Sequence, residues 1–192
     1  APLSIIAKAD APFNNFKELV EYSKKNNGAL FGFDAKPQEM TIRAINKNDG
    51  GNFKLVSHKS GNEVLKNILG GHVVAGYGAG SHIKYLKSGE IKMLAVATST
   101  RQAYSPDTQT LEEQGFPYSV EPYFYLAAPK GLPKAAKAAL AKAIDDAIRS
   151  PKATEVIVNT MFAEPKNLGP DSTLDKLVEG VEDIQTLINA AK

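Results

Sequence analysis

The chain has 192 residues, of which 43% are hydrophobic and 23% are charged, as is ordinary for a soluble globular protein. Its formal net charge of +2 is too small to favour nucleic acid or an anionic membrane surface as a partner. The chain has no cysteine, which excludes disulfides, thiol catalysis and zinc–thiolate sites. The length suits one sizeable domain or two small lobes.

The first half of the chain alternates strand and helix patterns. Asn15 and Glu18 form a capping box that opens a helix, and Gly28 stands where this helix would end. Further helices are expected after Pro37, over residues 62–69 and over residues 81–87. Short apolar runs predict strands over residues 3–8, 29–33, 53–57, 73–75 and 91–98. This alternation favours an α/β lobe with a mainly parallel sheet.

The pattern changes near Pro106. Thr110 and Glu113 form a second capping box, before a short helix that Gly115 would close. Residues 118–128 are expected to be extended and are rich in aromatic side chains. Three helices are predicted beyond them, from Pro133 to about Arg149, after Pro151 to about Asn159, and from Ser172 to Ala190. This last part has too few strands to make a balanced α/β domain of its own.

The stretch Gly76-Tyr77-Gly78-Ala79-Gly80-Ser81 nearly matches the dinucleotide-binding fingerprint, but a serine fills the place of the third glycine. The helix that follows is short, and Val96 stands where the acidic ribose-binding residue belongs. No Walker-type lysine follows the glycines. The stretch therefore does not predict nucleotide binding, and no cofactor is expected. The simpler interpretation is that the glycines let the chain leave a strand and turn sharply into a helix.

Ligands of open α/β sheets bind beyond the carboxyl ends of the strands, and glycines at a helix start leave N–H groups free for a carboxylate. Four loops follow such strand ends, at residues 33–38, 58–61, 78–81 and 99–101. His58 and His82 are expected at this edge of the sheet and His72 at the opposite edge. Two histidines are too few for a metal site, so none is predicted.

Three stretches of the chain resemble the solute receptors of tripartite tricarboxylate transporters, the Bug or TctC-like family. They are FNNFKELVEYSKKNNGALFG (13–32), LKNILGGHVVAGYGAGSHIKYLKSGEIKMLAVATSTR (65–101) and SPDTQTLEEQGFPYSVEPYFYLAAPKGLP (105–133). The second is similar to the family's leucine-glycine-glycine, strand, turn, helix and strand segment. The third is similar to its proline-aspartate element and aromatic crossover. The resemblance extends over nearly all of the chain and corresponds to the carboxyl-terminal two thirds of family members.

The resemblance implies a type II periplasmic-binding-protein-like fold with a cleft between two lobes. Residues 1–121 would form the second α/β lobe, and residues 122–192 would supply a crossover strand and helices of the first lobe. The amino-terminal part of that first lobe has no counterpart in this sequence. An incomplete first lobe would expose apolar surface, which leaves room for a homodimer.

The resemblance also implies a function. The chain would be a periplasmic receptor that captures a small organic acid, such as an amino acid or an aromatic acid, and delivers it to the membrane subunits of a transporter. The first residues, APLSIIAKADAP, lack the basic leader and long apolar core of a signal peptide. The sequence shows no nucleophile–base pair or paired carboxylates, so no enzyme activity is expected. An α/β enzyme or a ligand-sensing regulatory domain is the alternative.

The candidate ligand-binding residues follow the carboxyl ends of the predicted strands. They are Phe33, Asp34, Lys36, Gln38, His58, Lys59, Tyr77, Gly78, Ser81 and His82. Several depart from the family pattern. The loop after Gly32 lacks the family's hydroxyl side chains, and Gly78 replaces a family aspartate. Asp34 is unfavourable in a loop that receives an anion, so it points to an amine-bearing ligand or to a solvent-facing position. Phe33 and Tyr77 fit a pocket or the core equally well.

Overall fold

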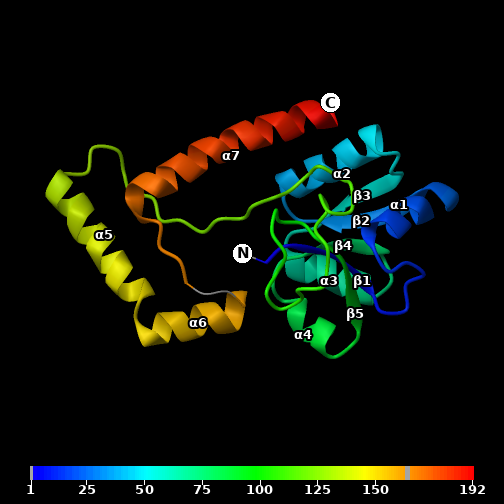
Figure 1. The fold of residues 1–192 in the computed structure, drawn as a ribbon, viewed down its shortest axis with the longest axis horizontal. Coiled ribbons are helices and arrows are strands. Elements are labelled where there is room, and N and C mark those ends of the chain that lie inside the picture. Colours follow the sequence, from blue (N-terminus) through cyan, green and yellow to red (C-terminus); the bar gives the residue numbers. More distant parts are fainter. Residues whose placement is uncertain (1, 163–164) are drawn as a thin grey trace.

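Five strands form one mixed sheet within the amino-terminal part of the chain (Figure 1). The computed structural model describes residues 2–162 and 165–192. The strand order is β3-β2-β4-β1-β5. The strands are β1 (Ser4–Lys8), β2 (Ala29–Phe33), β3 (Phe53–Ser57), β4 (Ala75–Gly78) and β5 (Ile91–Val96). β2 is parallel to β3 and β4, whereas β1 is antiparallel to both of its neighbours, β4 and β5. Four strands thus share one direction, which confirms the predicted α/β fold class with a parallel-rich sheet.

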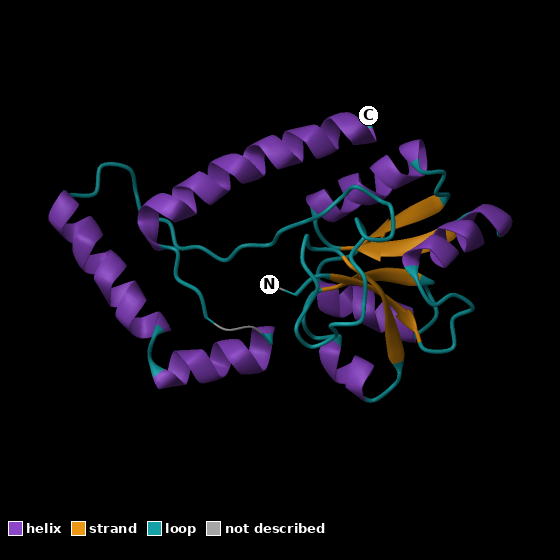
Figure 2. Cartoon of the chain, in the orientation of Figure 1, coloured by secondary structure: helices purple, strands orange, loops and turns teal. Residues whose placement is uncertain are grey.

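Helices cover both faces of this sheet (Figure 2). α1 (Phe16–Lys25) and α2 (Lys36–Asn48) bury Leu19, Ile42 and Ile45 in one core cluster with the aromatic side chains of β2, β3 and β4. α3 (Gly61–Leu69) and α4 (Ile83–Lys87) lie against the other face, where Val64 and Ile68 of α3 are fully buried. The sheet and its helices bring the carboxyl ends of β2, β3, β4 and β5 to one edge.

The glycines of the 76–80 stretch have a different role from the one expected. Gly76 and Gly78 lie inside β4, and only Gly80, with φ of 100°, makes the turn that follows. A Cβ on Gly76 would lie 2.7 Å from the carbonyl oxygen of Gly32 and 2.7 Å from Val64 Cγ1. The prediction of a turn is therefore confirmed at Gly80 and wrong at Gly76 and Gly78. At Gly76, β4 needs glycine for the close approach of β2 and α3.

The predicted helix at residues 111–115 is also absent from the described structure, where this segment forms hydrogen-bonded turns. The capping box itself is present. Thr110 Oγ1 accepts a hydrogen bond from the Glu113 amide (3.1 Å), and Glu113 Oε2 accepts one from the Thr110 amide (2.8 Å). Gly115, with φ of 91°, then reverses the chain so that Phe116 enters the core.

The carboxyl-terminal part leaves the sheet through an extended stretch without strand pairing and continues as three helices (Figure 1). They are α5 (Lys134–Ile148), α6 (Pro151–Met161) and α7 (Gly169–Ala191). α7 returns to lie beside α2, where Asn48 Nδ2 donates to the Ala190 carbonyl oxygen (3.1 Å) and Leu187 is buried. No helix among the described residues has the length and apolar character needed to cross a bilayer.

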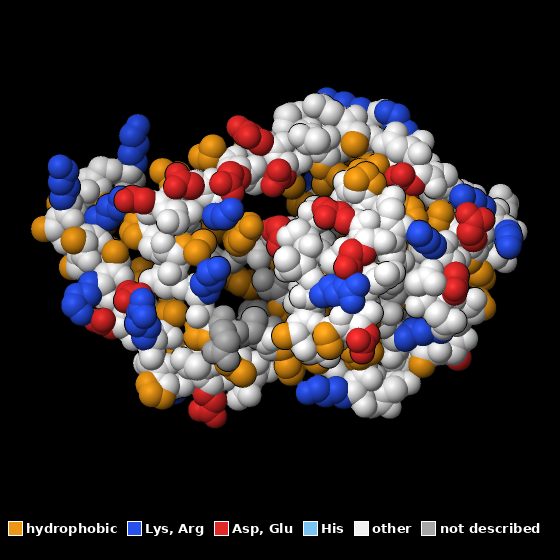
Figure 3. Space-filling view, in the orientation of Figure 1, with side chains coloured by type: hydrophobic (Ala, Val, Ile, Leu, Met, Phe, Trp, Pro, Cys, Tyr) orange, Lys and Arg blue, Asp and Glu red, His pale blue; other side chains and the backbone are white. Residues whose placement is uncertain are grey.

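Large apolar side chains stay exposed along this part, over the extended stretch and the three helices (Figure 3). They include Tyr123, Phe124, Tyr125, Leu126, Leu140, Val156, Leu174, Val178 and Val181. Phe124 and Leu126 have more than three quarters of their surface in water. The described residues of the 122–192 stretch therefore pack as a periphery with little core of their own.

Candidate functional site

A cleft of about 560 Å³ lies where the end of α6 meets the carboxyl edge of the sheet. Three segments line it: the start of α3, the loop after β4, and the end of α6. The lining residues are Ser60, Gly61, Asn62, Ala79, Gly80, Ser81, Lys84, Asn159, Thr160 and Phe162. Two of the four loops expected at a ligand site, residues 58–61 and 78–81, therefore contribute to the cleft.

The amino terminus of α3 opens onto this cleft. Ser60 caps the helix, and its Oγ accepts a hydrogen bond from the Glu63 amide (3.3 Å). Glu63 Oε2 in turn accepts from the Lys59 amide (2.7 Å). The amides of Gly61 and Asn62 precede the first amide that donates within the helix, that of Glu63, and both residues line the cleft. Together with the cation of Lys84, they form an electropositive rim suited to a carboxylate.

Asp34 lies behind this rim. Its backbone amide donates to Gln38 Oε1 (3.0 Å), which holds the loop between β2 and α2. Asp34 Oδ2 would lie 3.7 Å from a Cβ placed on Gly61, and Ala79 Cβ would lie 3.3 Å from the same point. Asp34 Oδ1 is buried and has no hydrogen-bond partner among the described residues. The Asp34 carboxylate therefore lies close to Gly61 at the start of α3.

His58 follows β3 and lies next to Asp34 across the strand pair. The register places Phe33 opposite Ser57, and the His58 amide donates to the Phe33 carbonyl oxygen (2.8 Å). The imidazole packs over Gly32, with Nδ1 3.5 Å from Asn67 Nδ2. His58 Nε2 is buried and lacks a hydrogen-bond partner among the described residues. Asp34 and His58 thus place two unsatisfied polar atoms at the ends of neighbouring strands.

His82 is buried in the protein interior and is held by hydrogen bonds. Its side chain is fully buried, and Nδ1 accepts a hydrogen bond from the Gly80 amide (3.1 Å). The neutral ring therefore carries its proton on Nε2, which lies 3.3 Å from the Tyr104 hydroxyl. The Tyr104 hydroxyl lies 3.1 Å from Ser4 Oγ. Burial lowers the pKa of His82 to about 4, so the imidazole is neutral in the folded protein near pH 7.

The other candidate residues are distributed around the same edge. Ser81 lines the cleft. Phe33 and Tyr77 are buried in the core with Phe31, and burial raises the pKa of Tyr77. Gln38 is buried, and Lys59 is exposed. Lys36 Nζ pairs with Glu39 Oε2 (2.8 Å). Gly78 lies against His82, since a Cβ on Gly78 would lie 2.7 Å from the His82 ring.

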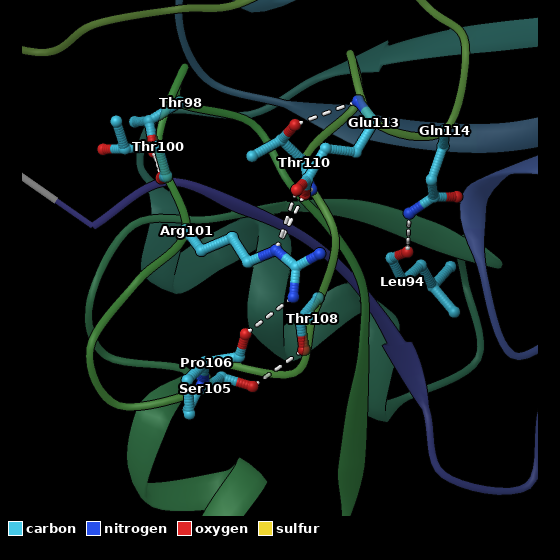
Figure 4. A network of polar contacts seen from close by, with 10 residues as sticks. All are labelled: Leu94, Thr98, Thr100, Arg101, Ser105, Pro106, Thr108, Thr110, Glu113 and Gln114. Carbon is cyan, nitrogen blue, oxygen red and sulfur yellow. Dashed lines mark hydrogen bonds and ion pairs between the residues drawn. The ribbon is translucent and has the colours of Figure 1, made fainter.

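The loop at residues 99–101 is held by a separate polar network (Figure 4). Arg101 Nε lies 2.9 Å from Glu113 Oε2, and Arg101 Nη1 donates to the Pro106 carbonyl oxygen (3.0 Å). The bond between the two side chains raises the pKa of Arg101 and lowers that of Glu113. Gln114 Nε2 donates to the Leu94 carbonyl oxygen (2.8 Å) and ties the turn to β5. Arg101 thus stabilises this loop, away from the cleft lining.

Sequence reasoning did not anticipate the contribution of α6. Asn159, Thr160 and Phe162 line the cleft from the carboxyl-terminal part of the chain. Phe162 adopts the left-handed conformation, with φ of 52°, at the end of α6. Its ring lies 6.1 Å from the ring of Tyr104, and Lys87 Nζ lies 5.1 Å from its centroid. The sequence predicted that a helix ends near Asn159. It did not show that this helix end lies across the cleft from α3 and the loop after β4.

No group of three or more histidine or acidic side chains suited to a metal ion occurs in the described part of the chain. The chemistry of the cleft is that of hydrogen-bond donors at a helix start, a lysine, small hydroxyl and amide side chains, and one adjacent carboxylate. This set can bind and orient a small polar ion.

Comparison with known proteins places these features in a family. The model of the tripartite tricarboxylate transporter family receptor matches residues 1–190. The chain is 22% identical to BugT of Bordetella pertussis over 186 residues, which cover 94% of the chain and 57% of BugT. Among solved structures, the periplasmic binding protein BugD is 26% identical, with a TM-score of 0.83. A protein of R. palustris solved with adipate is 20% identical, with a TM-score of 0.84.

The structural matches include 99% of this chain in both cases, but only 66% of BugD and 65% of the R. palustris protein. The chain therefore spans between about half and two thirds of the length of these relatives. The family match extends over both the sheet and the three carboxyl-terminal helices. The chain belongs to the family of tripartite tricarboxylate transporter receptors.

Proposed function

We propose that this chain is the ligand-binding part of a receptor for a small organic acid. The observation that carries the proposal is the α3 amino terminus in the cleft, where the amides of Gly61 and Asn62 lie near the cation of Lys84. Helix N-termini and lysines both favour carboxylate groups. The R. palustris relative solved with adipate binds a ligand of this chemical class.

The proposed mechanism is closure around the ligand. α3 and the loop after β4 contribute one wall of the cleft, and the end of α6 contributes the other. A carboxylate held at α3 would gain contacts from Asn159 and Thr160 when the two walls approach, as in hinged solute receptors. The ligand is then released unchanged, so no catalytic group is required.

The cellular setting forms part of the same proposal. BugD is a periplasmic binding protein, and family membership favours delivery of the ligand to the membrane subunits of a transporter. The exposed apolar side chains of residues 122–192 favour pairing with a second copy of the chain. Light scattering after gel filtration tests this last point, because a monomeric mass at micromolar concentration would contradict it.

A thermal-shift screen tests the binding function. A carboxylate present at 100 times its dissociation constant adds about 2.7 kcal/mol to the free energy of unfolding. For a chain of this size, the midpoint should rise by roughly 5 to 10 °C. The matching amides, such as succinamide against succinate, should have no effect. Lys84→Gln should reduce the shift, whereas Lys47→Gln, an exposed lysine in α2, is the matched control.

A further inference from the structure

We infer that His82 is the positioning residue of the cleft, because its imidazole holds the loop after β4 on one wall and, through the ring of Tyr104, seats Phe162 on the other. This role rests on the proposed carboxylate-binding function and concerns the same cleft. The His82 side chain is fully buried. It therefore acts on a bound acid through its neighbours rather than by direct contact.

The first contact of the imidazole fixes the loop after β4. His82 Nδ1 accepts a hydrogen bond from the Gly80 amide (3.1 Å), and the Gly80 carbonyl oxygen accepts one from the Ile83 amide (3.0 Å). Gly80 is buried. Without the imidazole its amide would be a buried donor with no partner, unless the loop moved toward water. Ala79, Gly80 and Ser81 all line the cleft, so such a movement would change its wall.

The second contact reaches the opposite wall. His82 Nε2 lies 3.3 Å from the Tyr104 hydroxyl, which also lies 3.1 Å from Ser4 Oγ in β1. Two polar partners thus fix the hydroxyl end of Tyr104. The Tyr104 ring packs against Phe162, with centroids 6.1 Å apart, and Phe162 lines the cleft at the end of α6. Phe162 has a φ of 52°, which is unfavourable for a bulky residue unless its surroundings hold it.

The strands beneath the imidazole are matched to it. Gly78 of β4 is paired with Ser4 of β1, and a Cβ on Gly78 would lie 2.7 Å from His82 Cγ and 2.8 Å from His82 Nδ1. Gly78 therefore leaves the space that the ring occupies, while Ser4 contacts the same hydroxyl as the ring. A neutral imidazole offers one acceptor and one donor on opposite sides of a rigid ring. His82 uses the acceptor toward Gly80 and the donor toward Tyr104, so one side chain joins both walls.

Calorimetric titration with succinate, glutarate and 3-phenylpropionate near pH 7 tests this role. His82→Leu removes both contacts and should weaken the binding of any acid that the unaltered chain binds by at least about tenfold. His82→Asn keeps an acceptor for the Gly80 amide, so its affinity should return to within about threefold of the unaltered chain. Leu19→Ala, in the core cluster on the other face of the sheet, is the control for stability. It should lower the unfolding midpoint and leave the affinity unchanged.

Hydrogen exchange of the unaltered chain adds a readout that needs no variant. The Gly80 amide should exchange more slowly than the amide of Ala79, its exposed neighbour in the same loop. Equally fast exchange at Gly80 would overturn the role of His82. Unchanged affinity in His82→Leu, or a loss that His82→Asn does not restore, would also overturn it and leave the receptor function standing. If none of the three acids binds the unaltered chain, the proposed function fails and the role of His82 fails with it.

Discussion

The ring of Phe162, at the end of α6, packs edge-on against the ring of Tyr104, with centroids 6.1 Å apart and an interplanar angle of 62°. Tyr104 lies 6.0 Å from the His82 ring, and its hydroxyl contacts Ser4 at the start of β1. These contacts connect the carboxyl-terminal helices to the carboxyl edge of the sheet. They also close one side of the cleft, since Phe162 belongs to its lining.

Phe162→Ala should loosen the end of α6. The loss of the aromatic contact with Tyr104 should lower the free energy of unfolding by about 1 kcal/mol, because Phe162 is only partly buried. The affinity for a carboxylate should fall, and the radius of gyration from small-angle scattering should rise. Phe124→Ala is the control, since this ring is 78% exposed. Equal effects of the two substitutions would contradict the role of Phe162 in the cleft.

His82 should make the stability depend on pH. Its pKa in the folded chain is lowered from 6.5 to about 4, so between these values the unfolded chain takes up a proton that the folded chain does not. The contribution of the neutral His82 side chain to the free energy of unfolding is fully present above pH 6.5. It should fall by about 3 kcal/mol between pH 6.5 and pH 4 through this group.

His82→Asn removes this titration and keeps an acceptor for the Gly80 amide. Urea unfolding at a series of pH values should therefore show a shallower slope for the variant between pH 6.5 and 4. His72→Asn is the control, because His72 is exposed at the opposite edge of the sheet. Parallel stability curves for the unaltered chain and His82→Asn would show that His82 is not the buried neutral group described.

Gly76→Ala should destabilise the sheet. The new Cβ would lie 2.7 Å from the Gly32 carbonyl oxygen, so β4 has to move away from β2 or α3. The expected loss is about 2–3 kcal/mol of the free energy of unfolding, measured by chemical denaturation. Gly180→Ala in α7 is the matched substitution, because a Cβ there meets no atom within 4 Å. It should stabilise the helix by up to about 1 kcal/mol. A neutral Gly76→Ala would contradict the close approach.

Asp34→Asn should stabilise the chain. The substitution removes a charge whose Oδ1 is buried without a partner, and partial exposure of the residue limits the gain to about 1 kcal/mol. Thermal unfolding without ligand measures this effect. A lower midpoint for Asp34→Asn would show that the carboxylate is satisfied in solution by groups of the chain itself.

Local patterns in the sequence were sufficient to predict most of the helices and strands. The Asn15 and Glu18 pattern marked the start of α1 correctly, and Asn15 Oδ1 accepts from the Glu18 amide (2.9 Å). Apolar runs located β2 and β3 at their observed bounds. Capping and strand patterns act within a few residues, so neighbouring sequence contains the information they need.

The pairing of distant segments could not be predicted in the same way. The antiparallel position of β1 between β4 and β5 depends on contacts between residues 68 to 92 positions apart. Gly76 was interpreted as part of a turn, because the close approach of Gly32 and Val64 is visible only in three dimensions. For the same reason, the loops at residues 58–61 and 78–81 were expected at the site, while Phe162 and Asn159 were not.

Carboxylate binding in the cleft can be measured by an amide chemical-shift titration of the ¹⁵N-labelled chain with L-glutamate and glutarate. We expect saturable shifts centred on the amides of Gly61, Asn62 and Ser81, at the start of α3 and the loop after β4. Shifts at Asn159 and Thr160 should follow the same binding curve. Shifts confined to residues away from the cleft, or none at millimolar concentrations of either acid, would contradict carboxylate binding at this site.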